Sequence, residues 1–128
     1  MTKNYNISLL NRNWESTILD RRFTMAVPKK PGIYKIFSGK GRYMKIPLGL
    51  QIHYVGKASR SIRSRFLDHT GSREHNNDLA KLASNSQLEF WFLELSPNEV
   101  DAAEIEAIKY YYSNNRENLL NKITYKGK

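Results

Sequence analysis

The chain contains no cysteine, and this absence removes several classes of chemistry at once. A protein without thiols cannot form disulfide bonds, use a cysteine nucleophile or bind a metal through thiolate ligands. No apolar run approaches the roughly 20 residues that a membrane-spanning helix requires. The first ten residues, MTKNYNISLL, lack the long apolar segment of a signal peptide, so we expect a cytoplasmic protein with no membrane partner.

Acidic residues are scarce beside basic ones. The 128 residues include 12 Asp and Glu against 21 Lys and Arg, which gives a formal net charge of +9. Such an excess favours a polyanionic partner, most often nucleic acid, because cationic side chains release the counterions condensed on phosphates. Charge alone does not choose between this function and simple solubility.

Several common site motifs are also missing. VGKAS (55–59) lacks the first glycine and the hydroxyl residue of a phosphate-binding loop, since Gln51 and Ala58 stand at those positions. The three histidines do not show the HExxH spacing of a zinc site, and no serine-hydrolase elbow is present.

Repeats and long linkers are absent too, so the length fits one domain with one core. Residues 1–30 predict an N-terminal extension that packs on a core domain of residues 31–128. Within the extension, Trp14, Ile18 and Leu19 fall on one helical face, before the prolines of VPKKPG (27–32) interrupt the pattern.

Three stretches predict strands: GIYKIF (32–37), QIHYVG (51–56) and LEFWFLEL (88–95). The glycine-rich segment 38–50 predicts the long arm of a hairpin that joins the first two. Strand alternation places Tyr34 with Ile36 on one face, and Tyr54 with Ile52 on one face. Pairing of the two strands would therefore direct both phenols toward the same surface.

Helices are predicted over about 60–69 with Ser59 as N-cap, over 76–84, and from the capping box SPNE (96–99) to about Tyr112. In the first of these helices, Arg65 and His69 are four residues apart and share a face. The order of elements predicts an α+β (mixed α/β) domain, in which helices flank a small antiparallel three-stranded sheet.

The last helix places a carboxylate among apolar side chains. On a wheel of about 100° per residue, Glu104 lies in the middle of the face formed by Val100, Ala107, Ile108 and Tyr111. A carboxylate there needs a cation, a metal or hydrogen bonds to offset its desolvation. Two alternatives stay open: a salt bridge to one of the arginines, or a ligand for a hard cation such as Mg²⁺.

The tripeptides GIY (32–34) and YVG (54–56) resemble the signature of the GIY-YIG nuclease family. Arg65, Glu104 and Asn121 follow in the order of that family, so the resemblance covers about residues 31–122. RFLDH, from Arg65 to His69, is similar to the restriction-endonuclease branch.

Two departures from the family pattern are visible. The segment between the two tripeptides is longer than in compact members, and Val55 replaces an isoleucine. Neither departure removes a polar group that the chemistry needs.

The resemblance implies an endonuclease that hydrolyses phosphodiester bonds of double-stranded DNA with one divalent metal, Mg²⁺ or Mn²⁺ in its place, as a monomer or a homodimer. Carried over, Glu104 would bind the metal and Arg65 would stabilise the negative charge of the transition state. Tyr34 would position or activate the attacking water.

A free phenol has a pKa near ~10 and is a poor base at neutral pH. Lys57 or His69 would therefore help Tyr34, by lowering its pKa or by relaying the proton. Tyr54 would hold a phosphate or the water by a hydrogen bond, and Asn121 would steady the site from the closing segment.

Each of these residues also has an ordinary structural interpretation. Strand tyrosines pack at the rim of a core, and an arginine contacts phosphates without catalysis. Taken singly, Tyr54, His69 and Asn121 fit such roles best. Taken jointly, Tyr34, Arg65 and Glu104 favour catalysis, and the alternative function is a non-catalytic nucleic-acid-binding protein on the same fold.

Overall fold

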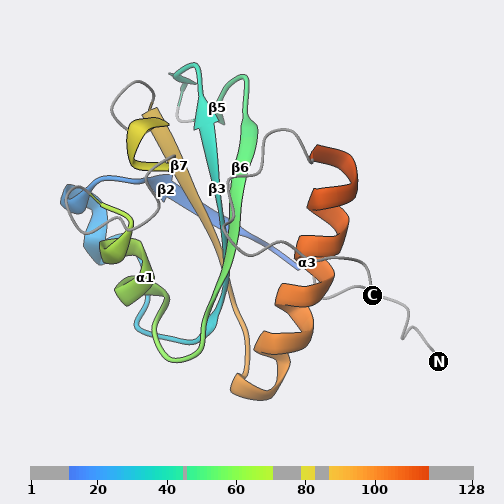
Figure 1. Cartoon of the computed structure of the whole chain (residues 1–128). Coiled ribbons are helices and arrows are strands. Elements are labelled where there is room, and N and C mark those ends of the chain that lie inside the picture. Colours follow the sequence, from blue (N-terminus) through green and yellow to red (C-terminus); the bar gives the residue numbers. More distant parts are fainter. Residues whose placement is uncertain (1–11, 45, 71–78, 83–86, 116–128) are drawn as a thin grey trace.

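The computed structural model describes residues 12–44, 46–70, 79–82 and 87–115 of the chain. A four-stranded antiparallel sheet forms its centre, with helix α1 on one face and helix α3 on the other (Figure 1). In spatial order the strands are β2 (Glu15–Ile18), β7 (Gln87–Glu94), β3 (Gly32–Gly39) and β6 (Gln51–Ala58). Helices among the described residues include η2 (Arg21–Ala26), α1 (Ile62–Asp68), η4 (Pro97–Glu99) and α3 (Val100–Asn115).

The mixed α+β class is confirmed, but the prediction of three strands is wrong because β2 adds a fourth. The predicted helical face of Trp14, Ile18 and Leu19 is wrong for the same reason. Residues Glu15–Ile18 pair with β7, with Ile18 opposite Glu89. This pairing satisfies backbone groups of β7 that would otherwise lie at an open sheet edge, and a periodicity of so few residues cannot reveal it.

Alternation along the strands divides the core into two layers. On the α1 face, Tyr34 and Ile36 pack with Ile62 and Phe66 of α1 and with Phe90 of β7. The layer on the α3 face consists of Ile33, Ile52, Val55, Leu93, Leu95, Val100, Ala103 and Ala107. The sheet therefore carries a buried surface on each side.

A β-bulge in β6 corrects one predicted face. Ile36 pairs with Tyr54, but the next pair is Phe37 with Ile52, so that His53 is an extra residue in the ladder. The extra residue moves Ile52 to the α3 face, and the prediction that it shares a face with Tyr54 is wrong.

Helix α1 begins later than predicted. Ser61, rather than Ser59, is the N-cap and accepts a hydrogen bond from the Ser64 backbone N–H at 3.2 Å. The N–H groups of Ile62 and Arg63 donate to carbonyls of the 28–30 segment, which fixes the first turn at this point.

The capping box at Ser96 forms as predicted, since the Ser96 backbone N–H donates to the Glu99 carboxylate at 3.2 Å. Most of the predicted helix at 76–84 lies outside the described residues, although 79–82 are helical. No helix within the described ranges has both the length and the apolar character needed to span a membrane.

The segment between β3 and β6 folds as the predicted hairpin arm. Its two short strands, β4 (Arg42–Tyr43) and β5 (Ile46–Pro47), pair with each other beyond the end of the main sheet (Figure 1).

Candidate functional site

The two phenols of the tripeptides meet a histidine on the α1 face of the sheet. The Tyr34 hydroxyl and Nε2 of His69 form a hydrogen bond of 2.8 Å. The rings of Tyr34 and Tyr54 are stacked with centroids 6.1 Å apart, and the Tyr54 and His69 rings are 5.1 Å apart. His69 directly follows α1, so the end of that helix positions the imidazole against both strands.

Gly56 determines where the Tyr34 ring lies. Tyr34 pairs with Gly56 across the ladder, and a Cβ atom at Gly56 would lie 2.5 Å from both Cζ and the hydroxyl oxygen of Tyr34. Only glycine therefore allows the phenol to cross over β6, which is the edge strand of the described sheet. The hydroxyl is held near this edge.

Tyr34 is covered in this conformation: 2% of the residue is exposed, and His69 is also buried. The hydrogen bond makes the imidazole the partner of the phenol, while Lys57 is engaged elsewhere. Of the two helpers left open by the sequence, His69 is the one that contacts Tyr34.

A second cluster lies on the α3 face, where Lys57 projects from β6 toward two carboxylates. Its Nζ atom is 2.6 Å from Oδ1 of Asp101 and 3.9 Å from Oε1 of Glu104. The hydrogen bond that the Lys57 ammonium donates to Asp101 raises the pKa of Lys57. Sequence reasoning missed Asp101, although its three-residue spacing from Glu104 places both carboxylates on one helix face.

Glu104 is partly buried, as its position on the helical wheel predicted. Burial raises the pKa of its carboxyl group; the Lys57 ammonium acts in the opposite direction, and the nearby charge of Asp101 raises the pKa further. The cation that faces Glu104 is thus a lysine at the limit of ion-pair distance, rather than one of the arginines.

The oxygen atoms of Glu104 and Asp101 fit a hard divalent cation. Mg²⁺ usually binds through one or two carboxylates and keeps water or phosphate oxygens as its other ligands. Among the described residues, no group of three or more His, Asp or Glu is arranged to hold a metal. A metal bound at Glu104 would need its remaining ligands from water or from a bound phosphate.

Arg65 projects from α1 into solvent. Its side chain is 53% exposed and forms an ion pair with Asp68 of the same helix at 3.4 Å. The backbone carbonyl of Arg65 accepts a hydrogen bond from the His69 N–H, so the two residues lie on adjacent turns. Asn121, the remaining predicted site residue, lies outside the described residues.

The predicted residues thus form two groups on opposite faces of the sheet. Tyr34 packs in the cluster on the α1 face and His69 is hydrogen-bonded to it, whereas Glu104 belongs to α3. The two helices lie on opposite faces of the sheet (Figure 1). Both groups border consecutive residues of one strand: the phenol crosses Gly56, and Lys57 contacts the carboxylates. Any shared site must lie around the β6 edge rather than within one face.

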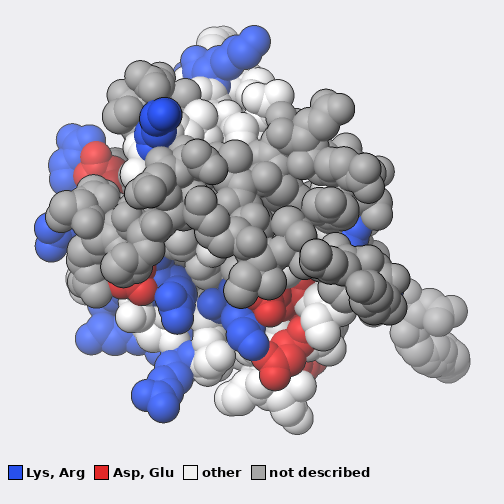
Figure 2. Space-filling view, in the orientation of Figure 1, with Lys and Arg blue, Asp and Glu red and all other residues white. Residues whose placement is uncertain are grey.

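The visible surface carries charges of different sign in different places. Figure 2 shows Lys and Arg side chains gathered over the region of α1 and η2, and Asp and Glu side chains grouped near the start of α3. Exposed cations of the first region are Arg21, Arg22, Lys29, Lys30, Arg60 and Arg65.

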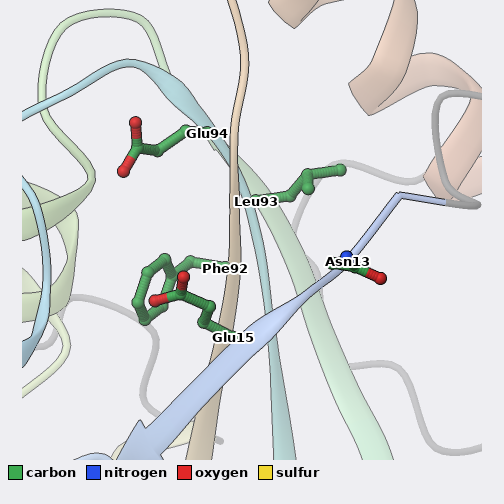
Figure 3. Close-up of a pocket in the computed structure, with 5 residues that line it drawn as sticks. All are labelled: Asn13, Glu15, Phe92, Leu93 and Glu94. Carbon is green, nitrogen blue, oxygen red and sulfur yellow. The ribbon is translucent and has the colours of Figure 1, made fainter.

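A depression of about 150 Å³ lies elsewhere, between β2 and the end of β7 (Figure 3). Its lining residues are Asn13, Glu15, Phe92, Leu93 and Glu94. None of the predicted site residues lines it. Two carboxylates without a lysine or arginine among these lining residues make it unsuited to a phosphate.

Lys35 is a buried cation that sequence reasoning did not single out. It is 8% exposed, and its Nζ atom lies 3.9 Å from the ring centroid of Trp14 and donates a hydrogen bond to the Tyr111 hydroxyl. Burial lowers the pKa of Lys35 to about 8. The signal was readable, because Lys35 shares its strand face with the apolar Ile33 and Phe37.

No protein-family model, curated protein or solved structure matches the chain.

Proposed function

We propose that this protein is a divalent-metal-dependent endonuclease that hydrolyses phosphodiester bonds of DNA. One observation carries the proposal: a phenol–imidazole pair and a partly buried carboxylate flank Gly56 and Lys57, consecutive residues of one edge strand. A sugar–phosphate backbone that follows this edge would meet groups from both faces. The GIY and YVG tripeptides, with Arg65 and Glu104 in the expected order, resemble the GIY-YIG nucleases.

The phenol–imidazole pair supplies a route for a proton. A water molecule beside the Tyr34 hydroxyl would lose its proton to the phenol oxygen as the phenol proton passes to Nε2 of His69. This relay requires the neutral imidazole with an unprotonated Nε2. Removal of the imidazole would leave the phenol as a poor base at neutral pH.

Glu104 would hold the metal at the other side of the strand. A divalent metal held there would supply Lewis-acid neutralisation of the charge that develops on the phosphate oxygens. Lys57 contributes a second positive charge. Its ion pair with Asp101 keeps the Lys57 ammonium within reach of Glu104. The exposed guanidinium of Arg65 would pair with phosphate oxygens, which its planar donors match.

The charge distribution along the chain supports a polyanionic substrate. Between Arg21 and Leu67 there are twelve of the 21 lysines and arginines and none of the acidic residues. This segment contains β3, the arm, β6 and most of α1, which are the elements that carry Tyr34, Lys57 and Arg65. Phosphate binding by such a surface weakens steeply as salt increases.

Substitution of Glu104 tests the proposal. The Glu104→Gln variant keeps the shape of the side chain and removes its charge, so the rate of plasmid nicking in Mg²⁺ is expected to fall by at least about a hundredfold. Glu106→Gln, on the same helix but outside the Lys57 cluster, is the matched control and should cut normally. Equal nicking rates for the two variants would overturn the role of Glu104.

The alternative is a nucleic-acid-binding protein that does not cut. The burial of Tyr34 and the separation of Tyr34 and Glu104 onto two faces favour it. In that case the unaltered protein would bind DNA with a strong salt dependence and would cleave neither plasmid nor oligonucleotide with any divalent ion.

A further inference from the structure

The tip of the arm exposes large apolar side chains to solvent. Tyr43, Met44 and Ile46 are all exposed, Met44 to 78%. Tyr43 ends β4, Met44 follows it and Ile46 begins β5, beyond the end of the main sheet. Apolar side chains that gather at one protruding point indicate a contact with another molecule.

The base of the arm is fixed to the sheet by a buried ion pair. Nε of Arg42 donates to Oε2 of Glu89 at 3.1 Å, and a second guanidinium nitrogen contacts the other carboxylate oxygen. Glu89 is fully buried, and Gln87 donates to it as well. Because a two-point contact between guanidinium and carboxylate fixes orientation, it holds the arm in one direction relative to β7.

Met44 has an unusual backbone conformation for its residue type. Its φ angle is 50°, in the left-handed region that Gly, Asn and Asp occupy at the tips of tight hairpins. A methionine side chain does not stabilise this backbone conformation, since it has no polar group that could form a hydrogen bond with the turn. A strained, exposed and apolar residue on an arm that Arg42 anchors to the sheet indicates that the side chain itself has a function.

Charge favours nucleic acid as the contact. Lys40 is exposed at the base of the arm, and the whole segment from Arg21 to Leu67 contains no acidic residue. Figure 2 shows Lys or Arg side chains at the top of the molecule, where the arm lies in Figure 1. A second copy of the chain would present the same positive charge and repel this surface.

We propose that Met44, flanked by Tyr43 and Ile46, is an apolar wedge that inserts between stacked bases of the DNA substrate. Methionine is among the side chains that proteins insert at base steps to unstack and kink a duplex. This inference rests on the proposed nuclease function and adds a contact with the bases away from the hydrolysed bond.

The strand fixes how far the wedge acts from the site. Tyr34 and Gly39 are five positions apart on β3, so the base of the arm lies about 17 Å from Tyr34 at about 3.3 Å per residue. At about 3.4 Å per base step, this distance corresponds to about five base pairs. The unstacked step is therefore expected about five or more base pairs from the cut.

Fluorescence of 2-aminopurine tests the wedge. Duplexes carry this base at single positions on either side of the main cut, and the full chain bears Glu104→Gln so that the complex persists. Fluorescence is expected to rise at one position about five or more base pairs from the cut, because unstacking relieves quenching. Adding Met44→Asn should abolish the rise. It should also weaken binding about tenfold, since the methionine side chain would no longer be buried between the bases.

The asparagine suits the backbone of the turn, so Met44→Asn is expected to fold at least as well as the parent chain. Met25→Asn, at an equally exposed methionine of η2, is the matched control and should leave the fluorescence rise intact. Circular dichroism melting of all three proteins checks their folding.

Other outcomes would overturn the wedge. A fluorescence rise that persists after Met44→Asn is added to the Glu104→Gln chain, while the chain with Glu104 intact cuts DNA, contradicts the wedge and leaves the nuclease. Self-association or binding to anionic vesicles that Met44→Asn abolishes, without any effect on the bases, assigns the tip to a second copy or a lipid surface. A chain that neither binds nor cuts DNA refutes the proposed function together with the wedge.

Discussion

At Glu104, the burial predicted from the sequence can be compared directly with the burial and the charged neighbours in the structure. Its place among apolar residues of the α3 wheel predicted a partly buried carboxylate, and the structure has one. Its partner, however, could not be predicted, because Lys57 comes from a strand 47 positions earlier and meets α3 through the buried cluster that contains Val55 and Ala103. Asp101 was missed because an exposed acid in the first turn of a helix is ordinary.

The pKa of Glu104 is expected to respond in opposite directions to two neighbouring substitutions. Lys57→Met removes the cation that favours the carboxylate, so the pKa of Glu104 should rise further above its ordinary value. Asp101→Asn removes a like charge and frees the ammonium for Glu104, so the pKa should fall.

Carbon-13 NMR titration of the Glu104 carboxyl group in each variant measures both changes. For the proposed nuclease, the acid limb of the pH–rate profile should move to higher pH in Lys57→Met, because a protonated carboxyl does not hold a metal. Shifts of the same sign in the two variants would contradict the electrostatic account.

At the scale of elements, the strands with strong local signals were predictable and the pairing partners were not. GIYKIF and LEFWFLEL are rich in branched and aromatic residues, and both form strands of the central sheet. Strand β2 has no such signal, and it forms because β7 offers an edge to pair with. The bulge at His53 likewise depends on the partner strand, so the face of Ile52 could not be read from alternation.

Lys35 of strand β3 links three elements of the fold. Its ammonium lies over the ring of Trp14, just before β2, and donates a hydrogen bond to Tyr111 of α3. The folded pKa of about 8 lies below the ordinary value of 10.5. Below pH 8 both states are protonated and the cost of burying the charge is fully present. As pH rises from 8 to 10.5 the folded state loses the proton first, so the free energy of unfolding should rise.

Chemical denaturation of the parent chain and of Lys35→Met across this pH range tests the effect. The variant should lack this rise, and at pH 7 it should be more stable by at most about 3 kcal/mol, less whatever the cation–π contact with Trp14 contributes. Lys30→Met, at an exposed lysine, is the control and should follow the parent chain. A parent chain and Lys35→Met variant with parallel pH profiles would show that Lys35 keeps its ordinary pKa in the fold.

For the whole molecule, the arrangement of charge and of the two clusters decides what can be bound. The net charge of +9 predicted a polyanionic partner, but the sequence could not show that Tyr34 and Glu104 lie on opposite faces of the sheet. Hydrophobic periodicity shows which side of each helix or strand is buried. It does not show which face of the sheet α1 and α3 each cover. The edge strand β6 is the feature that brings the two clusters near each other.

A double-substitution cycle tests most directly whether both faces serve one phosphodiester bond. Single-turnover plasmid nicking in Mg²⁺ would be measured for the parent chain, Tyr34→Phe, Glu104→Gln and the double variant. Groups that act in one transition state are strongly non-additive, so the double variant should be no more than about tenfold slower than the slower single variant. Rate losses that multiply, or a Tyr34→Phe variant that cuts as fast as the parent chain, would contradict a shared site around the β6 edge.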